Sequence, residues 1–330
     1  MKQHTLSKTA ERIYWLGRYL ERAESTARLV NVNGNLLIDL PRRIQLSWVS
    51  LIDIMGMRSQ FYEHYETPDE RSVVRYLVTD TNNPGSLLTS LSMARENART
   101  IREIMPRVAF EYINDLYLYA KERASGTMSR SRTSEMMEGV MRRVQHIAGF
   151  LSGTMLHGDT WSFLRIGEFL ERADMTTRII DVRSVAPQDT AGLEPYSQLQ
   201  WRSVLRSLHA LQAFHLAVQE PIQQSLVLEF LFTNDALPRS LAYTTSRIRS
   251  SLRSLPRNQK PLSAINRVIR FLDSVDVATL KDADLHTFID DCQRHLSYLD
   301  KEISRTYFHA RLRVAEGQSQ TQTKRTTTSA

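Results

Sequence analysis

Two stretches of this sequence decide its fold: WLGRYLERAESTARLVNV at residues 15–32 and RIGEFLERADMTTRIIDV at residues 165–182. In and just before the first stretch, apolar side chains recur at steps of three and four residues, at Ile13, Leu16, Leu20, Ala23, Ala27 and Val30. That spacing places them on one face of an α-helix, whereas a half-buried strand would alternate apolar and polar residues. The pattern predicts a long amphipathic helix, and most of the remaining sequence shows the same helical period.

The second stretch reads as a copy of the first. The two align without gaps, and eight of eighteen positions are identical: Gly17/Gly167, Leu20/Leu170, Glu21/Glu171, Arg22/Arg172, Ala23/Ala173, Thr26/Thr176, Arg28/Arg178 and Val32/Val182. The match continues downstream in the same order, from QLSW at 45–48 to QLQW at 198–201, and from YLVTDTNNPGSL at 76–87 to FLFTNDALPRSL at 230–241. We therefore predict an all-α fold of two tandem pseudo-repeats of a helical-bundle unit, residues 8–157 and 158–312, packed into one body.

Local signals place the ends of several helices. Gly34 is a plausible residue to close the first helix, and Asn83 and Pro84 are suited to be the N-cap and first position of another. Further helices are predicted over residues 44–65, 84–104, 108–123 and 134–155. Residues 313–330, which end in GQSQTQTKRTTTSA, are predicted to form a disordered polar tail.

Composition narrows the class of protein. The net charge is +7, but basic and acidic residues are interleaved rather than gathered in runs, so we expect no nucleic-acid binding. The single cysteine, Cys292, excludes an internal disulfide and favours a reducing compartment. No stretch has the character of a signal peptide or the length of a membrane span. The expected location is the cytoplasm.

Charged residues of the two stretches are the candidate site. They are Glu21, Arg22, Glu24, Arg28, Glu171, Arg172, Asp174 and Arg178. At about 100° per residue, Glu21, Glu24 and Arg28 fall on one flank of the first helix, and the second helix repeats this arrangement. Glu24 lies four residues before Arg28, and Asp174 lies four residues before Arg178. An acid that precedes a base at this spacing in a helix favours an ion pair.

Several chemistries are open to these residues. A carboxylate-bridged metal pair would need Glu-x-x-His elements, which the sequence lacks, so we predict no metal and no cofactor. Acid–base catalysis lacks a recognisable nucleophile motif. The arginines Arg22, Arg28, Arg172 and Arg178 suit a pocket for a carboxylate or phosphate. The favoured interpretation is a balanced ion-pair network that fixes the register of two central helices.

The residues that carry a family resemblance are LSKTAERIYWLGRYLERAESTARLVNVN at 6–33 and FLRIGEFLERADMTTRIIDV at 163–182. Together they resemble the bacterial alpha-E family, a predicted all-helical domain named for its Glu-Arg motif. The likeness covers roughly residues 1–312, with Glu21-Arg22 and Glu171-Arg172 at the motif positions. The resemblance implies an uncharacterised helical protein. It also implies partners, because members typically occur beside a circularly permuted ATP-grasp protein and a transglutaminase-like cysteine protease.

The functional hypothesis combines the motif chemistry with that resemblance. The chain has neither a Gly-rich nucleotide loop nor a Cys-His-Asp arrangement, so a non-catalytic role is favoured. We expect an interaction or scaffold component of an ATP-grasp ligase and transglutaminase-like peptidase system in peptide or amide-bond metabolism. The alternative is an enzyme or anionic-ligand-binding protein that uses the paired Glu-Arg helices as a polar site. Asymmetry between the two copies would favour the alternative, and the clear swaps are Glu24/Asp174 and Arg18/Glu168.

Overall fold

A computed structural model describes residues 7–39, 48–126, 129–184 and 197–308. Every regular element in these residues is a helix, and none of them lies in a strand, which confirms the predicted all-α class. The predicted tail, residues 313–330, lies outside the described residues. None of the described helices combines the length and the apolar character needed to cross a bilayer.

Within the described residues, α-helices follow one another along the chain. The first seven are α1 (Ser7–Asp39), α2 (Val49–Met55), α3 (Arg58–Tyr62), α4 (Glu70–Val78), α5 (Leu87–Thr100), α6 (Arg107–Ala124) and α7 (Arg130–Thr154). The next seven are α8 (Asp159–Ser184), α9 (Ser197–Ser207), α10 (Leu211–Val218), α11 (Gln224–Thr233), α12 (Leu241–Ser254), α13 (Gln259–Asp273) and α14 (Asp282–Tyr307). In the described residues, Arg102–Ile104 and Val277–Thr279 form single-turn 3₁₀ helices.

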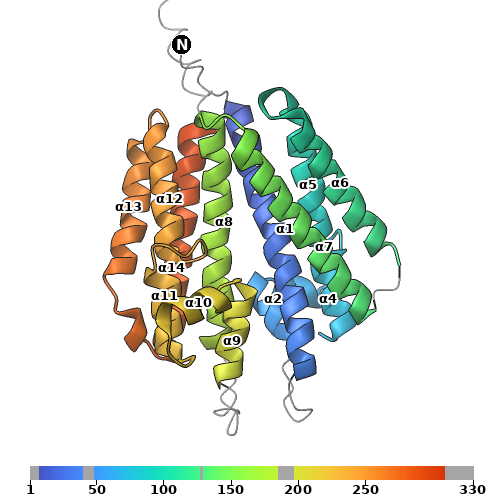
Figure 1. Cartoon of the computed structure of the whole chain (residues 1–330), viewed down its shortest axis with the longest axis vertical. Coiled ribbons are helices and arrows are strands. Elements are labelled where there is room, and N and C mark those ends of the chain that lie inside the picture. The colour runs from blue at the N-terminus through green and yellow to red at the C-terminus, as the bar shows by residue number, and fades with distance from the viewer. Residues whose placement is uncertain (1–6, 40–47, 127–128, 185–196, 309–330) are drawn as a thin grey trace, which may run out of the picture.

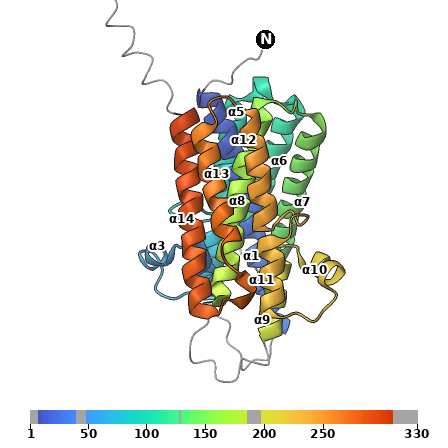
Figure 2. The ribbon, with the colours of Figure 1, turned by 90° about the vertical axis from the view of Figure 1, so that its left-hand side faces the viewer.

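The two helices that carry LERA lie side by side at the centre of the molecule (Figure 1). Helices α5, α6 and α7 flank α1 on one side, and α12, α13 and α14 flank α8 on the other, as the turned view in Figure 2 also shows. The short helices gather towards one end, where α2 packs on α8 and α9 packs on α1. Apolar side chains from both sides form one continuous core, so the charged residues of α1 and α8 are placed inside it.

Helices α1 and α8 approach closely because each presents a glycine to the other. A Cβ atom added to Gly17 would lie less than 3.0 Å from the backbone carbonyl oxygen of Leu164. A Cβ added to Gly167 would meet the carbonyl oxygen of Tyr14 in the same way. The obstacle is backbone in both cases, so glycine is what permits this separation of the two helices.

Some predicted helix ends are wrong. Helix α1 continues through Gly34 to Asp39. The helix predicted over residues 44–65 is interrupted at Gly56, whose φ of 66° lies in the left-handed region and ends α2. An extended amphipathic pattern thus hides a break that a single glycine produces.

The start of α5 also differs from the prediction. The N-cap is Ser86, whose hydroxyl accepts a hydrogen bond from the backbone N–H of Thr89. The Asn83 side chain instead donates to the carbonyl of Tyr76 and accepts from the N–H of Gly85, so it closes the turn before the helix. Two capping residues three apart compete in such a sequence, and the hydrogen-bond partners decide between them.

Candidate functional site

The two Glu-Arg pairs exchange partners across the α1–α8 interface. The Glu21 carboxylate accepts a hydrogen bond of 2.7 Å from Nη2 of Arg172. Reciprocally, Glu171 accepts 2.5 Å and 3.0 Å bonds from Nε and Nη2 of Arg22. Each glutamate is 2% exposed. In each pair, the arginine side chain, Arg172 or Arg22, crosses to the glutamate of the facing helix.

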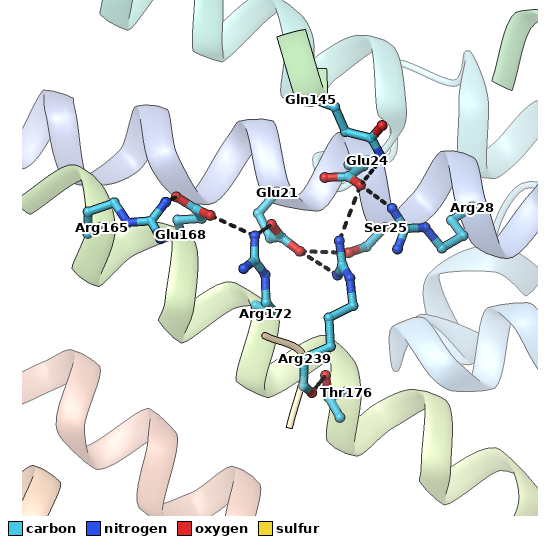
Figure 3. A network of polar contacts seen from close by, with 10 residues as sticks. All are labelled: Glu21, Glu24, Ser25, Arg28, Gln145, Arg165, Glu168, Arg172, Thr176 and Arg239. Carbon is cyan, nitrogen blue, oxygen red and sulfur yellow. Dashed lines mark hydrogen bonds and ion pairs between the residues drawn. The ribbon is translucent and has the colours of Figure 1, made fainter. Parts of the chain in front are cut away.

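Around Glu21 the carboxylates are buried and lie among several polar partners (Figure 3). Arg239, which precedes α12, donates to Glu21 at 2.8 Å and to Glu24 at 3.2 Å. Gln145 of α7 donates to Glu24 at 3.2 Å, and Arg28 pairs with the same carboxylate. Sequence reasoning predicted neither Arg239 nor Gln145, because both come from distant segments.

Burial and charge act in opposite directions on this cluster. Burial alone would raise the pKa of Glu21, but Arg172 and Arg239 outweigh it and hold that pKa well below its usual value. Arg28 is 1% exposed, and its Nε and Nη1 have no hydrogen-bond partner among the described residues. Burial, reinforced by the charge of Arg239, lowers the pKa of Arg28 to about 10. The Glu21 carboxylate is thus ionised and is paired with both Arg172 and Arg239.

The ion-pair network extends along α8 to Glu168, whose counterpart in the aligned stretch of α1 has the opposite charge. Glu168 accepts hydrogen bonds from Arg172 at 2.6 Å and from Arg165 at 2.5 Å. The aligned residue of α1 is Arg18. Arg172 is therefore shared between two carboxylates, and burial, which would lower its pKa, is outweighed by Glu21 and Glu168, which raise it.

Around Glu171 the second arginine comes from α1 itself. Nε of Arg18 donates to Glu171 at 2.7 Å, and its Nη1 donates to Asp300 of α14 at 3.0 Å. The hydroxyl of Tyr14 also donates to Asp300, and burial raises the pKa of Tyr14. Burial would raise the pKa of Glu171, but Arg18 and Arg22 lower it to about 2.

One side of the network opens to solvent. Asp174 and Arg178 form a pair at 2.8 Å, with side chains 22% and 28% exposed. They line a cleft of about 580 Å³ between α1, α8 and α14, together with Arg22 and the α14 residues Asp290 and Asp300. We call this the α14 cleft.

Comparison with known proteins agrees with the motif. Residues 5–308 match the family Alpha-E, described as a predicted alpha-helical domain with a conserved ER motif. This chain belongs to the Alpha-E family. Uncharacterized proteins of Mycobacterium bovis and of two strains of Mycobacterium tuberculosis are 22% identical to it over 284 residues, which cover 80% of this chain and 31% of each relative. The chain thus spans about a third of the length of these bacterial relatives. No solved structure matches it.

The structure divides the eight predicted residues of this Alpha-E protein between two environments. Buried in the enclosed cluster or beneath the cleft are Glu21, Glu24, Arg28, Glu171 and Arg172. At the wall of the α14 cleft are Arg22, Asp174 and Arg178. The swap of Arg18 and Glu168 is a sequence signal of this difference, because Arg18 bonds to Glu171 and Glu168 bonds to Arg172.

A further charged group lies near the end of the cleft. Atoms of Asp181, His286 and Asp290 that are able to bind a cation lie within 4.8 Å of one another. Nδ1 of His286 is hydrogen-bonded with Asp181 at 2.7 Å, and this bond raises the pKa of His286. The pair is explained without an ion, and the expectation of no metal and no cofactor stays a prediction.

Proposed function

We propose that this protein is a non-catalytic interaction component that serves an ATP-grasp-type ligase and a transglutaminase-like peptidase in peptide or amide-bond metabolism. In this proposal it acts in the cytoplasm as a scaffold and does not bind nucleic acid. Its central ER motif then has an architectural role, which is to fix how α1 and α8 meet.

The observation that supports the proposal is that both glutamates of the motif are buried and already bound by arginines. Glu21 and Glu171 are each 2% exposed and are each bound by two arginines. A general acid or base needs a pKa near the working pH and contact with substrate. The paired arginines keep the pKa of both carboxylates far below that range. The geometry therefore favours a structural role over acid–base chemistry. In that role the ion pairs hold α1 and α8 in one fixed alignment, which we call the register lock.

We further propose that residues 8–157 and 158–312 are two copies of one helical unit. Reciprocal packing supports this: Gly17 meets the backbone of α8, and Gly167 meets the backbone of α1. Each ER motif pairs with the motif of the other helix, and α2 packs on α8 as α9 packs on α1. Two units that exchange contacts in this way would hold each other as one body.

The length of the mycobacterial relatives also supports a role beside other protein domains. The matched segment makes up 31% of those chains, so a similar helical region occurs there within a much longer protein. This agrees with the partners that the family resemblance implies, a ligase and a peptidase. The identity of the partners rests on that resemblance.

Two measurements test the proposal. Glu21→Ala and Glu171→Ala should both lower the melting temperature, since removing one side of a buried ion pair costs about 3–5 kcal/mol. Glu138→Ala is the matched control, because Glu138 is 51% exposed and pairs with Arg142 at the surface, where a lost pair costs less than about 1 kcal/mol. Unchanged or raised melting of both core variants would reject the register lock.

The scaffold role has its own test. The full chain, mixed with the ATP-grasp-type protein and the transglutaminase-like protein of the same genome, should co-elute with one of them on size-exclusion chromatography. The ligase or peptidase activity should reside in those partners. If neither protein associates with the chain, the scaffold role is wrong, even if the ER motif is structural.

A second candidate function, a binding protein for a small charged ligand, is favoured by the α14 cleft. Three of the eight predicted residues reach its wall, so part of the polar motif remains accessible to a ligand. Arginine forks suit carboxylates and phosphates.

A further inference from the structure

The α14 cleft has the size of a ligand site but an unusual lining. Its volume of about 580 Å³ lies within the usual range of small-molecule pockets, about 300–1,000 Å³. Most such pockets are lined by apolar side chains, whereas this one is lined mainly by charged and polar groups. An apolar ligand would leave those groups desolvated without partners, so the occupant must be polar.

Arginine side chains provide fixed donors on the α1–α8 side of the cleft. Arg22 uses Nε and Nη2 to bind Glu171, and Arg178 uses Nε to bind Asp174. Among the described residues, Nη1 of Arg22 and both Nη atoms of Arg178 make no hydrogen bond. These guanidinium groups are held in place by the carboxylates behind them and offer their remaining N–H groups to a ligand carboxylate.

Carboxylates provide acceptors on the α14 side. Asp290 is 55% exposed; Nε2 of His286 lies 3.9 Å from its carboxylate, and a carboxylate oxygen of Asp181 lies within 4.8 Å. Asp300, 30% exposed, lies farther along the helix and is shared by Arg18 and Tyr14. Asp290 is thus an acceptor that remains available to a ligand ammonium group.

The charge balance decides between ligand classes. Four arginines of the lining, Arg18, Arg22, Arg178 and Arg294, face three aspartates. The buried carboxylate of Glu171, which lies against Arg18 and Arg22, balances the remaining positive charge. A multiply charged anion such as a nucleotide triphosphate would meet no net positive field here, whereas a ligand with one charge of each sign would find a partner for both.

The opposite side of α1 and α8 cannot offer the same site. There Arg239 and Gln145 occupy the space beside Glu21 and Glu24, and each is bonded to one or both carboxylates (Figure 3). On the open side, Arg18 of α1 is the second arginine of Glu171, and the α14 cleft lies beside it. A binding site needs unlike groups, and the side of the helix pair that faces α14 offers them as arginines and aspartates.

We propose that the α14 cleft binds a small zwitterion with one carboxylate and one ammonium group, an amino acid or a short peptide. The carboxylate would bind Arg22 and Arg178, and the ammonium group would bind Asp290. The inference rests on the second candidate function and names its ligand class. It is independent of the scaffold role.

Calorimetric titration of the full chain tests this inference with five probes. L-alanine and L-alanyl-L-alanine carry both charges and separate the amino-acid source from the peptide source. N-acetyl-L-alanine carries the carboxylate alone, L-alanine amide carries the ammonium group alone, and inorganic phosphate is a simple anion. At least one zwitterion should bind, and both single-charge analogues should bind at least tenfold more weakly.

Variants then assign the binding to the cleft. Asp290→Asn should weaken zwitterion binding at least tenfold and leave the melting temperature unchanged, because Asp290 is exposed. Asp115→Asn is the matched control on α6, where Asp115 is 66% exposed and pairs with Arg143. Arg22→Lys keeps the charge but loses the fork, and should also weaken binding.

The results that follow would contradict the inference, and one of them would also contradict the second candidate function. If N-acetyl-L-alanine or phosphate binds as tightly as the zwitterions, the cleft is a plain anion site and the inference is wrong while the second candidate function stands. Zwitterion binding that survives Asp290→Asn also overturns the inference. If no probe binds the unmodified chain at millimolar concentration, both the inference and the second candidate function are wrong.

Discussion

The contact between α1 and α8 at glycine gives the sharpest test of the architecture. We predict that Gly17→Ala destabilises the protein although alanine is the better helix former. A Cβ at Gly17 would lie less than 3.0 Å from the carbonyl oxygen of Leu164 and 3.0 Å from the backbone nitrogen of Glu168. Backbone atoms of a packed helix have no rotamer by which to move aside, so one helix must shift.

The magnitude follows from two opposing effects. Replacing glycine by alanine inside a helix gains about 1 kcal/mol. Overpacking of a close contact costs about 1–3 kcal/mol and occasionally more. A shift of α1 would also stretch the 2.7 Å bond from Arg172 to Glu21, one turn away. The net effect at Gly17 is therefore a loss of up to about 2 kcal/mol, to which stretching of the bond between Arg172 and Glu21 adds.

Gly149→Ala provides a control of opposite sign. Gly149 lies inside α7, and an added Cβ would meet nothing within 4 Å, so this variant should gain about 1 kcal/mol. Thermal and urea unfolding, followed by far-ultraviolet circular dichroism, should place Gly17→Ala at least about 4 °C below Gly149→Ala. A Gly17→Ala protein that melts at or above Gly149→Ala would refute the close packing of α1 on α8.

Three further predictions concern charge and reactivity. The pKa of Glu171 is about 2 in the folded chain against an ordinary 4.5. The ionised side chain therefore contributes about 3 kcal/mol to the free energy of unfolding above pH 4.5, and this contribution is lost as the pH falls through about 2. Glu171→Gln should flatten that part of the plot of stability against pH, and an unchanged plot would contradict the prediction. Elemental analysis of the purified protein should find no stoichiometric transition metal; one bound ion per chain would instead point to the His286 group. Cys292 is 1% exposed and burial raises its pKa to about 12, so a maleimide should label it slowly until the chain unfolds, whereas rapid labelling of the folded protein would contradict its burial.

The sequence was sufficient to predict the fold class because the helical period is carried by many residues at once. A single exception, such as Gly34 inside α1, does not change that average. Helix ends depend on one or two residues, and the prediction failed there. At Gly56 the chain adopts a left-handed conformation within an otherwise helical pattern, and at α5 the cap is Ser86 instead of Asn83.

The candidate site was predictable in part for a similar reason. Residues of one helix, such as Glu24 and Arg28, are paired by their spacing, and that pair is present. Contacts across helices have no such local signal. Arg239 lies 218 residues from Glu21, and its role depends on where α12 packs. Sequence reasoning therefore found the carboxylates and the arginines of the two helices, but it found neither Arg239 nor Gln145.

The two swapped positions show how one helix pair becomes closed on one side and open on the other. Arg18 lies on α1 and supplies the second arginine of Glu171, whereas the aligned Glu168 takes a share of Arg172. Alone, either swap would leave a buried charge without a partner, at a cost of several kcal/mol. The enclosed side is completed by Arg239, at the position where the aligned block has Gly85. A glycine there brings no guanidinium to Glu171, so Arg18 of α1 must fill that role, and the exposed Asp174 pair is left at the cleft wall, where a ligand can reach it.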